Sequence, residues 1–324
     1  MWYNNGMKNM FIVMTAALAL AGCFQDGADA AKQRAKVGTY NIRMMWGDKD
    51  TPNAWEARRE DMAAQLKSFD LDAGGLQEVC PDQETFLREK MPEYAFVGDH
   101  RGEDRIQVES SNVFFKTNRF ELVKTGTFWL SETPEEPGKK GWGAACPRVC
   151  TWALLKDRKS GRRLCFANTH TDHVSALARA EGMKLILERM KTFSEGAPVV
   201  FTGDHNCRET EEPAKLAAET LKNAIYVSKT PPAGPWRTLN LWQWRDVEKS
   251  CAEALASPID ARNACKGSPD GSKEKHYEEY GVRIDYIYVS PVIDVLDVVT
   301  HGEPRPGTKL YPSDHFPVTA TIEF

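Results

Sequence analysis

Two short motifs in this chain place a carboxylate directly beside an imidazole. They are Asp204-His205, which follows Gly203, and Asp314-His315, which follows Ser313. A carboxylate can bind a divalent metal ion, and an imidazole can stabilise the negative charge that develops on a phosphate under attack. The chain also carries four further polar motifs, which are Asn41, Gln77-Glu78, Asn168-Thr169-His170 and Asp285-Tyr286. This set of acids, amides and imidazoles predicts metal-assisted chemistry on phosphate.

The polar motifs lie at the ends of apolar, strand-like runs. The run Val199-Val200-Phe201 leads to Asp204 and Asn206. In residues 163–170, the alternate residues Leu164, Phe166, Asn168 and His170 share one face of the predicted strand. This face starts apolar and ends in an imidazole. A rigid sheet can direct several strand ends towards one point. We therefore expect these side chains to meet.

The elements that position the motifs alternate along the chain from Val37 onward. The patterns predict strands at 37–43, 73–79, 111–115, 125–130, 151–155, 163–169, 198–202, 282–290, 292–299 and 316–324. They predict helices at 54–69, 83–90, 175–193 and 213–223. Strands precede, separate and follow the helices, which favours a mixed α/β layered domain.

A long polar segment interrupts this alternation at about residues 231–280. Long segments without regular structure inside a domain tend to be functional or disordered. Three tryptophans near its start, Trp236, Trp242 and Trp244, argue against disorder. We expect an ordered insertion near one end of the sheets.

Length and charge limit the class of protein. The 324 residues suffice for one large α/β domain or two small ones. A formal charge of −4 argues against tight non-specific binding of nucleic acid, which a basic surface would favour. It does not exclude a nuclease, because a metal site is itself built from acids.

The first residues have the pattern of an export signal. An apolar run, Phe11 to Leu20, follows Lys8 and is too short to span a bilayer. The ending Leu20-Ala21-Gly22-Cys23 resembles a bacterial lipobox, which implies a signal peptide at 1–22 and lipid attachment at Cys23. The alternative is an ordinary signal with a chance cysteine. On the first interpretation, residues 23–36 form a flexible tether, residues 37–324 the folded domain, and the protein is a membrane-anchored lipoprotein, periplasmic or on the cell surface.

The cysteines leave the disulfide pattern open. Of eight cysteines, seven follow Cys23. Cys251 and Cys265 either form a bridge that closes a loop, which would contribute roughly 3 kcal/mol in the chain-entropy model, or remain free thiols. Cys146 and Cys150 are a second candidate pair.

Taken together and in this order, the polar motifs resemble those of the endonuclease/exonuclease/phosphatase superfamily. Its members include deoxyribonucleases, deadenylases, sphingomyelinases and inositol phosphatases. The resemblance extends from Val37 to Phe324. It implies a four-layer α/β sandwich, in which helices flank two packed mixed β-sheets. It also implies a divalent cofactor, most often Mg²⁺ with Mn²⁺ as an alternative, as one or two ions.

The resemblance also implies roles for single residues. Glu78, Asn41 and Asp314 resemble the metal ligands. Asp204 resembles the residue that orients or deprotonates the attacking water, and Asn206 the amide beside it. His170 and His315 resemble the donors to the phosphate oxygens, and Asp285 the acid that orients His315. The competing interpretations are a turn for Asn41 and for Asp204-His205-Asn206, and a salt bridge for Asp285.

Four further residues have two interpretations each. Arg148 and Arg179 either bind a substrate phosphate, which a guanidinium matches in a bidentate way, or form structural ion pairs. Asp172 and His173 belong either to the rim of the site or to the turn before the helix that starts at Ser175, and we favour the turn for Asp172.

The sequence thus predicts a metal-dependent phosphoesterase in which water attacks phosphorus in line. Its partner would be a phosphorylated substrate: nucleic acid, a phospholipid head group or a phospho-sugar. Nuclease activity is favoured on frequency within the superfamily alone, and a phospholipid or phospho-sugar phosphodiesterase or phosphatase is the alternative. A non-catalytic ligand-binding lipoprotein is the alternative of another class, but such a protein should lack some of the expected acids or imidazoles.

Overall fold

A computed structural model describes residues 32–102, 109–263 and 278–324. The expected signal peptide, the lipobox and residues 23–31 of the expected tether lie outside the described residues, as does Cys265. Within the described ranges, no helix has both the length and the apolar character needed to cross a membrane.

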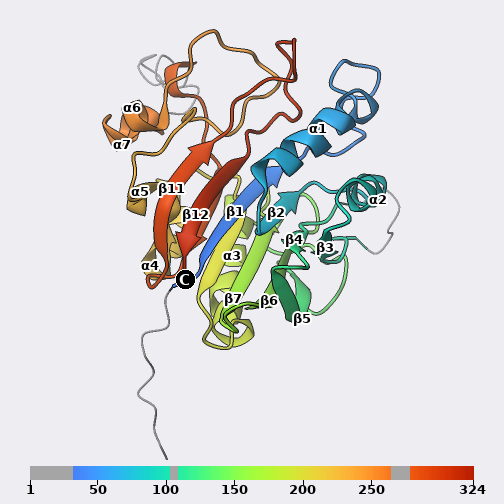
Figure 1. The fold of residues 1–324 in the computed structure, drawn as a ribbon, viewed down its shortest axis with the longest axis vertical. Coiled ribbons are helices and arrows are strands. Elements are labelled where there is room, and N and C mark those ends of the chain that lie inside the picture. Colours follow the sequence, from blue (N-terminus) through green and yellow to red (C-terminus); the bar gives the residue numbers. More distant parts are fainter. Residues whose placement is uncertain (1–31, 103–108, 264–277) are drawn as a thin grey trace, which may run out of the picture. The chain divides into compact units, whose positions relative to one another are not determined.

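Two six-stranded sheets form the centre of the domain. The first has the order β11-β12-β1-β2-β4-β3, and the second β5-β6-β7-β8-β10-β9. Figure 1 shows β11, β12, β1 and β2 side by side in this order. The bounds of the first sheet are β1 Arg34–Asn41, β2 Ala73–Gln77, β3 Tyr94–Val97, β4 Val113–Lys116, β11 Asp294–Thr300 and β12 Val318–Glu323. Those of the second are β5 Phe120–Trp129, β6 Val149–Asp157, β7 Arg163–His170, β8 Val199–Asp204, β9 Lys222–Asn223 and β10 Asp285–Val289.

Both sheets are mixed, as predicted. In the first, β1 runs parallel to β2 and antiparallel to β12. In the second, β7 runs parallel to β8, and the other pairs are antiparallel. The first strand begins at Arg34, three residues earlier than predicted, because Arg34 to Lys36 pair with Glu323 to Thr321 of β12. Residues 34–36 are therefore part of the sheet and not of the tether.

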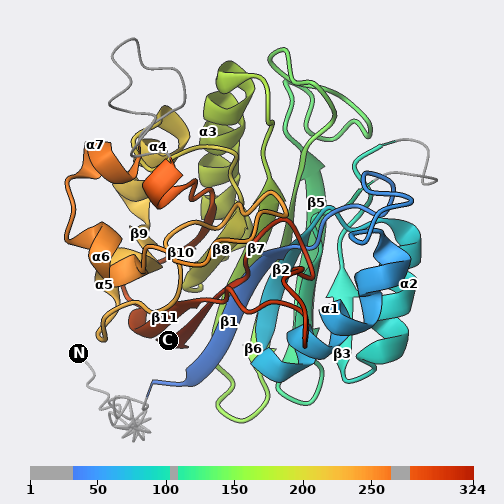
Figure 2. The same ribbon diagram turned by 90° about the horizontal axis from the view of Figure 1, so that it is seen from above.

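Helices cover the outer faces of the sheets. They are α1 Trp55–Phe69, α2 Pro81–Lys90, α3 Ala176–Phe193 and α4 Glu212–Thr220. The short helices α5 Ala224–Val227, α6 Cys251–Leu255 and α7 Ile259–Arg262 do not share this position, and Ile225 of α5 and Ala254 of α6 pack against the core between the sheets. Met62 and Leu66 of α1 pack on the first sheet, and Met183 and Ile186 of α3 pack on the second. Figure 2 shows α1 and α2 on one side of the strands, apart from α3 and α4. The expected sandwich of two packed sheets flanked by helices is thus confirmed.

The apolar core between the sheets draws on both of them. Val37 and Ile322 of the first sheet pack with Phe166 and Val200 of the second. Burial of such side chains contributes about 1.5–3 kcal/mol each. This contact holds the two sheets, and hence their strand ends, in one fixed arrangement.

The register of the parallel pairs places the polar strand ends beside one another. Asn41 stands opposite Gln77, and His170 stands opposite Asp204. Asp285, at the start of the antiparallel β10, also pairs with Asp204. In each sheet, the polar motifs therefore lie together at one end of neighbouring strands.

Cys146 and Cys150, the second candidate pair, do not form a disulfide. Both are free thiols, because Cys150 points into the core beneath α3 while Cys146 lies in the loop before β6. Cys251 is a free, fully buried thiol, and its Sγ lies 3.1 Å from the Pro235 carbonyl oxygen.

Candidate active site

Side chains from both sheets meet around one cavity of about 310 Å³. Its lining includes Glu78, His170, Asp204, Asn206, Asp314 and His315. Asn41 and Asp285 lie directly behind this lining, hydrogen-bonded to Glu78 and His315 respectively. The structure therefore brings together all eight of the acids, amides and imidazoles that the sequence singled out as metal ligands or catalytic groups.

Asp285, His315 and Asp204 form a buried row. His315 Nδ1 lies 2.9 Å from Asp285 Oδ2, and His315 Nε2 lies 3.7 Å from Asp204 Oδ2. Burial alone would lower the pKa of His315, but the charge and hydrogen bond of Asp285, with the charge of Asp204, raise it well above its usual value. His315 is thus held as an imidazolium that can donate from Nε2.

Asp204 is a carboxylate with a shifted proton affinity. Burial, reinforced by the charge of Asp285, raises the pKa of Asp204 to about 7. The backbone N–H of Asn206 donates to its Oδ1 at 2.9 Å, and Asn41 Nδ2 donates to its Oδ2 at 3.0 Å. A carboxylate that titrates near neutral pH is suited to accept a proton from water.

Glu78 occupies a backbone conformation that is uncommon for a residue with a side chain. Its φ is +60°, in the left-handed region, where strain of about 1–3 kcal/mol is common at functional sites. Its Oε1 accepts from Asn41 Nδ2 at 2.9 Å and its Oε2 from the Met44 N–H at 3.0 Å. Burial raises the pKa of Glu78, but these two hydrogen bonds outweigh it and hold the pKa below its usual value. Glu78 is therefore ionised.

Asp314 faces Arg43 across the cavity. Burial raises the pKa of Asp314, with the Glu78 charge adding to it, and the charges of His315 and Arg43 oppose the rise. Arg43 Nη1 lies 3.6 Å from Asp314 Oδ2, and its Nε donates to Asp48 at 2.9 Å. The loop after β1 therefore places the guanidinium of Arg43 beside the acids.

The donor chemistry around Glu78 fits a divalent metal. The carboxylate oxygens of Glu78 and Asp314 are ligands that a hard cation prefers, and the charge of Glu78 adds to the rise in the pKa of the buried Asp314. A cation there would offset this repulsion. Asn41, expected as a third ligand, instead turns its Nδ2 towards Glu78 and Asp204, and its Oδ1 accepts the Arg43 N–H at 3.0 Å. Asp204, Asp285 and His315 also offer ligand atoms within 4.8 Å of one another. Because His315 Nδ1 and Asp285 Oδ2 already bond each other, that trio is better suited to handling a proton.

His170 differs from its expected role as a donor. Asn206 Nδ2 donates to the Thr171 carbonyl oxygen at 3.1 Å, which fixes the orientation of this amide, and lies 2.9 Å from His170 Nε2. His170 Nε2 is therefore an acceptor and its proton sits on Nδ1. Burial, with the charges of Arg148 and Arg101, lowers the pKa of His170 well below its usual value.

His205, the partner in the first acid–imidazole motif, points away from the cavity. Its ring stacks on Tyr288, with centroids 5.6 Å apart, and contacts Phe201. Burial lowers its pKa to about 4, so it is neutral. Adjacent residues of an extended segment face opposite sides, which is why Asp204 enters the site and His205 does not.

The two candidate arginines have different surroundings. Arg148 lines the cavity, is buried, and its Nη1 has no hydrogen-bond partner among the described residues. Arg179, on α3, does not line the cavity; it donates to the Asp172 carbonyl oxygen and approaches Glu211 at 3.5 Å. Of these two arginines, only Arg148 is placed to reach a ligand in the cavity.

The sequence reasoning missed several residues that line the cavity, namely Arg43, Met44, Arg101, Glu109, Cys146, Leu239, Leu241 and Ile284. Arg43 stands two residues after Asn41, which could have drawn attention to it. The Arg101–Glu109 ion pair, at 2.7 Å, arises from a loop without a comparable signal.

A segment of the expected insertion holds the catalytic candidates in place. Thr238 Oγ1 accepts the backbone N–H groups of Ile284 and Asp285, at 3.0 and 3.1 Å. Asn240 donates through its backbone to the Asp314 carbonyl oxygen and through Nδ2 to that of Ser313. These buried contacts fix both the start of β10 and the loop before β12.

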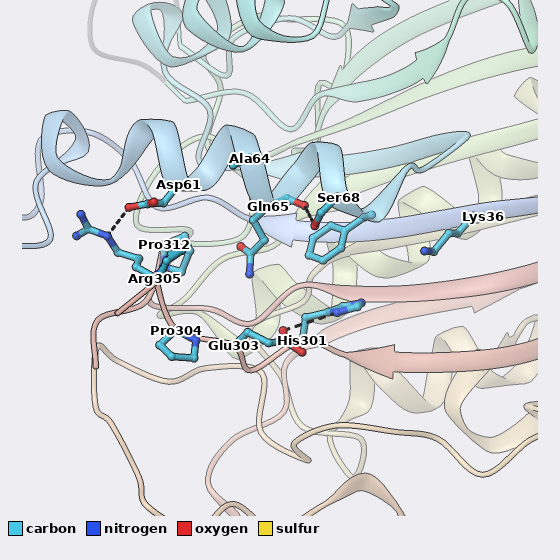
Figure 3. A pocket seen from close by; sticks show the side chains of 12 residues that line it. Lys36, Asp61, Ala64, Gln65, Ser68, His301, Glu303, Pro304, Arg305 and Pro312 are labelled. Atoms are coloured by element: carbon cyan, nitrogen blue, oxygen red, sulfur yellow. Dashed lines mark hydrogen bonds and ion pairs between the residues drawn. The ribbon is translucent and has the colours of Figure 1, made fainter. Parts of the chain in front are cut away.

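A larger cavity, of about 440 Å³, lies elsewhere. Figure 3 shows it between α1 and the segment 301–312, with Arg305 and Asp61 paired at 2.7 Å along its edge. None of the candidate catalytic residues lines it. Size alone therefore does not identify the functional site.

Comparison with known proteins agrees with this geometry. The sequence profile of the Endonuclease/Exonuclease/phosphatase family matches residues 38–315. A solved structure of a protein of that family from Bacteroides thetaiotaomicron is 28% identical, with a TM-score of 0.75, and the superposition covers 90% of this chain and 98% of that chain.

Two relatives with named activities are also similar. The mannosyl-6-phosphatase of Bacteroides thetaiotaomicron VPI-5482 is 28% identical with a TM-score of 0.74, over 90% of this chain and 100% of that chain. The CCR4-Not complex 3'-5'-exoribonuclease subunit Ccr4 of Mycosarcoma maydis is 26% identical over 170 residues, which is 44% of this chain. The matched part spans 25% of the length of that exoribonuclease subunit.

Proposed function

The chain belongs to the endonuclease/exonuclease/phosphatase family, and we propose that it removes the phosphate group from a small phosphorylated molecule such as a sugar phosphate. That it is a phosphoesterase follows from the family, whose members are metal-dependent hydrolases of phosphoric esters. The proposal concerns the substrate and the role of each residue.

The form of the cavity carries the choice of substrate. Its volume of about 310 Å³ lies at the lower end of the range for small-molecule sites. Proteins that hold single-stranded nucleic acid combine a basic groove with aromatic side chains on which bases stack. The described residues that line this cavity include three arginines but no Trp, Tyr or Phe. These features favour a compact, anionic ligand over a polymer.

The similarities are consistent with this choice. The mannosyl-6-phosphatase superposes over its whole length, whereas the exoribonuclease subunit matches less than half of this chain. The nuclease favoured by frequency within the superfamily remains the second candidate, supported by that shorter match.

The roles we propose follow from the positions of the side chains. Glu78 and Asp314 would hold a divalent cation, which when bound stabilises charge on the phosphate oxygens, and Asn41 orients Glu78 by donating from its Nδ2. Asp204 accepts a proton from the attacking water, for which its raised pKa suits it. His315, kept protonated by Asp285, donates from Nε2 to a phosphate oxygen.

The remaining residues bind and orient. Arg148 presents its unpaired Nη1 to the phosphate, since a guanidinium forms strong charge-assisted hydrogen bonds to phosphate oxygens. His170 accepts from Asn206 and thereby fixes this amide beside Asp204.

A substrate panel tests the proposal. The full chain is assayed with Mg²⁺ and with a chelator on mannose 6-phosphate, other hexose phosphates, a generic phosphodiester and poly(A) RNA. We expect kcat/KM for a hexose phosphate to exceed that for the diester by at least about 100-fold, as a site built around a dianion discriminates strongly. Faster turnover of poly(A) RNA or of the diester would identify a nuclease or phosphodiesterase instead.

A further inference from the structure

A second group of metal-ligating side chains lies beside the catalytic cavity. Cys146, Asp172 and His173 offer a sulfur, an oxygen and a nitrogen atom that lie within 4.8 Å of one another. Cys146 and His173 also line the cavity. Asp172 is buried, Cys146 is half-buried and His173 is exposed, so the group can be reached from solvent.

The sheet fixes this juxtaposition. Strands β6 and β7 pair antiparallel, with Cys150 opposite Thr169 as the last pair. Position 146 lies in the loop that leads into β6, and position 173 lies in the loop that leaves β7. Asp172 joins the two segments, because its Oδ2 accepts the Ala145 N–H at 3.0 Å. The three ligands are therefore presented by two loops that flank this strand pair and are joined to each other through Asp172.

The ligand set selects a different cation from the catalytic one. Thiolate and imidazole are preferred by Zn²⁺ and similar ions, whereas Mg²⁺ prefers oxygen ligands throughout. Three protein ligands and one open position are a common arrangement for zinc. We propose that Cys146, Asp172 and His173 form a binding site for a thiophilic divalent cation such as Zn²⁺, separate from the catalytic metal position.

Arg148 competes with a cation at this site. Its Nη2 lies 2.9 Å from His173 Nδ1, and because an arginine only donates, Nδ1 is the acceptor and Nε2 carries the proton. A cation that binds Nδ1 displaces Arg148, and one that binds Nε2 moves the proton to Nδ1, which can then no longer accept. Either way the Arg148–His173 hydrogen bond is lost. Cation binding is therefore coupled to the arginine that faces the catalytic cavity.

Cobalt absorption tests the proposal without any measurement of turnover. The reduced, metal-free full chain is titrated with Co²⁺, whose bond to a thiolate gives a charge-transfer band, and Zn²⁺ is then added to displace it. We expect one such band per chain. The band should disappear in Cys146→Ser. In His173→Asn, the affinity for Co²⁺ should fall by at least about tenfold, the range typical for losing a ligand or its support.

Two further variants separate this site from the catalytic one. Glu78→Gln removes a catalytic metal ligand and should keep the thiolate band. Arg148→Ala removes the guanidinium that competes with the metal ion and should tighten Co²⁺ binding. Asp172 is not substituted, because its Oδ1 also accepts the N–H groups of Val174 and Ser175. Circular dichroism and thermal melting confirm that each variant folds.

The proposal is overturned by any of three results in folded protein: no thiolate band in the unmodified chain, a band unchanged in Cys146→Ser, or a band lost in Glu78→Gln. The last result would place the cobalt in the catalytic centre. None of these outcomes depends on which phosphate ester the enzyme hydrolyses.

Discussion

At the scale of single residues, the site depends on charges that burial would otherwise suppress. His315 is buried, yet Asp285 at 2.9 Å raises its pKa well above the usual value. Glu78 is buried, yet the Met44 and Asn41 hydrogen bonds keep it ionised. Each charge is thus maintained by one or two named neighbours, and removing the neighbour should remove the charge.

Asp285→Asn tests this dependence. The variant keeps the size of the side chain but loses the charge that raises the pKa of His315. His315 should therefore lose its proton at a lower pH, and the alkaline limb of the pH–activity profile should move to lower pH. We expect kcat at neutral pH to fall by about 10²- to 10⁴-fold, the usual range for a positioned proton donor.

The matching control is Asp260→Asn, an exposed aspartate on α7. It should leave the profile unchanged. A kcat for Asp285→Asn near that of the unmodified enzyme, with the same alkaline limb, would show that His315 does not donate in its charged form.

His301 provides a pH test away from the catalytic site. Its ring packs on Phe69 with centroids 4.3 Å apart, and burial, aided by the charge of Lys36, lowers its pKa to about 4. The folded-state pKa is thus below the unfolded one of about 6.5. As pH falls through this interval, the unfolded chain binds a proton that the folded chain does not, so stability is lost progressively down to about pH 4.

His301→Gln should remove this part of the acid sensitivity while keeping a donor near Thr319, which His301 Nε2 contacts at 2.9 Å. Urea unfolding at pH 7 and at pH 4.5 gives the measurement. Between pH 7 and pH 4.5, we expect the free energy of unfolding to fall by on the order of 1–2 kcal/mol less in the variant than in the unmodified protein. Equal losses would mean that His301 is not neutral in the folded state.

At the scale of elements, the sequence predicted the strands and long helices that carry periodic patterns. The helix expected at 175–193 is α3, which begins at Ala176 because Ser175 Oγ caps it by accepting the Ala178 N–H. The polar strand ends at Glu78, His170 and Asp204 were predicted for the same reason, since alternation marks where an apolar face ends.

The elements that the sequence did not predict lack such periodicity. Strand β3 has four residues and β9 two, and the helices of the insertion, α6 and α7, have five and four. The contacts of Thr238 and Asn240 with β10 and the Asp314 loop join segments about 45 and 75 residues apart. Local pattern contains no information about such pairings, so the role of the insertion in holding the site emerged only from the structure.

Thr238→Val tests whether the insertion positions β10. The substitution keeps the shape but removes the oxygen that accepts the N–H groups of Ile284 and Asp285. Two buried donors left unpaired cost about 1–3 kcal/mol each. We expect lower stability to urea and, because Asp285 is displaced, a lower kcat at a temperature where the variant is folded.

Thr238→Ser is the control, since it retains the accepting oxygen and should restore most of kcat. If Thr238→Val and Thr238→Ser were equally active, the hydroxyl oxygen would have no part in placing Asp285.

At the scale of the whole molecule, the site exists only because two sheets meet at a fixed distance. The first sheet supplies Asn41 and Glu78, and the second supplies His170 and Asp204. Gly75 of β2 permits the approach, because a Cβ there would lie 2.3 Å from Asn168 Oδ1. The polar ends of the strand-like runs, and the family resemblance, predicted that these strand ends converge, but the side-chain pairing across the sheets could not be predicted from the sequence.

Asn168 is the side chain that joins the sheets. Its Oδ1 accepts from Gln77 Nε2 at 2.6 Å, and its Nδ2 donates to the carbonyl oxygens of Leu76 and Asn112, both at 2.8 Å. Asn168→Ala would remove these three hydrogen bonds between the sheets, although Gln77 Nε2 would keep Thr39 Oγ1 as a partner and the Asn112 carbonyl oxygen would keep the Leu76 N–H. At about 0.5–1.5 kcal/mol net for each lost hydrogen bond, we expect a loss of roughly 2–4 kcal/mol in the free energy of unfolding.

Activity should fall with stability in this variant, because Glu78 and His170 would no longer be held at one separation. The control is Thr169→Val, which removes a hydrogen bond to the Val149 carbonyl oxygen within the second sheet only. It should cost roughly 1 kcal/mol and leave kcat nearly unchanged. Equal effects of the two substitutions on kcat would show that the spacing of the sheets is set by the apolar core alone. A selective loss of kcat in Asn168→Ala, at a temperature where both variants are folded, would assign that spacing to the Asn168 amide.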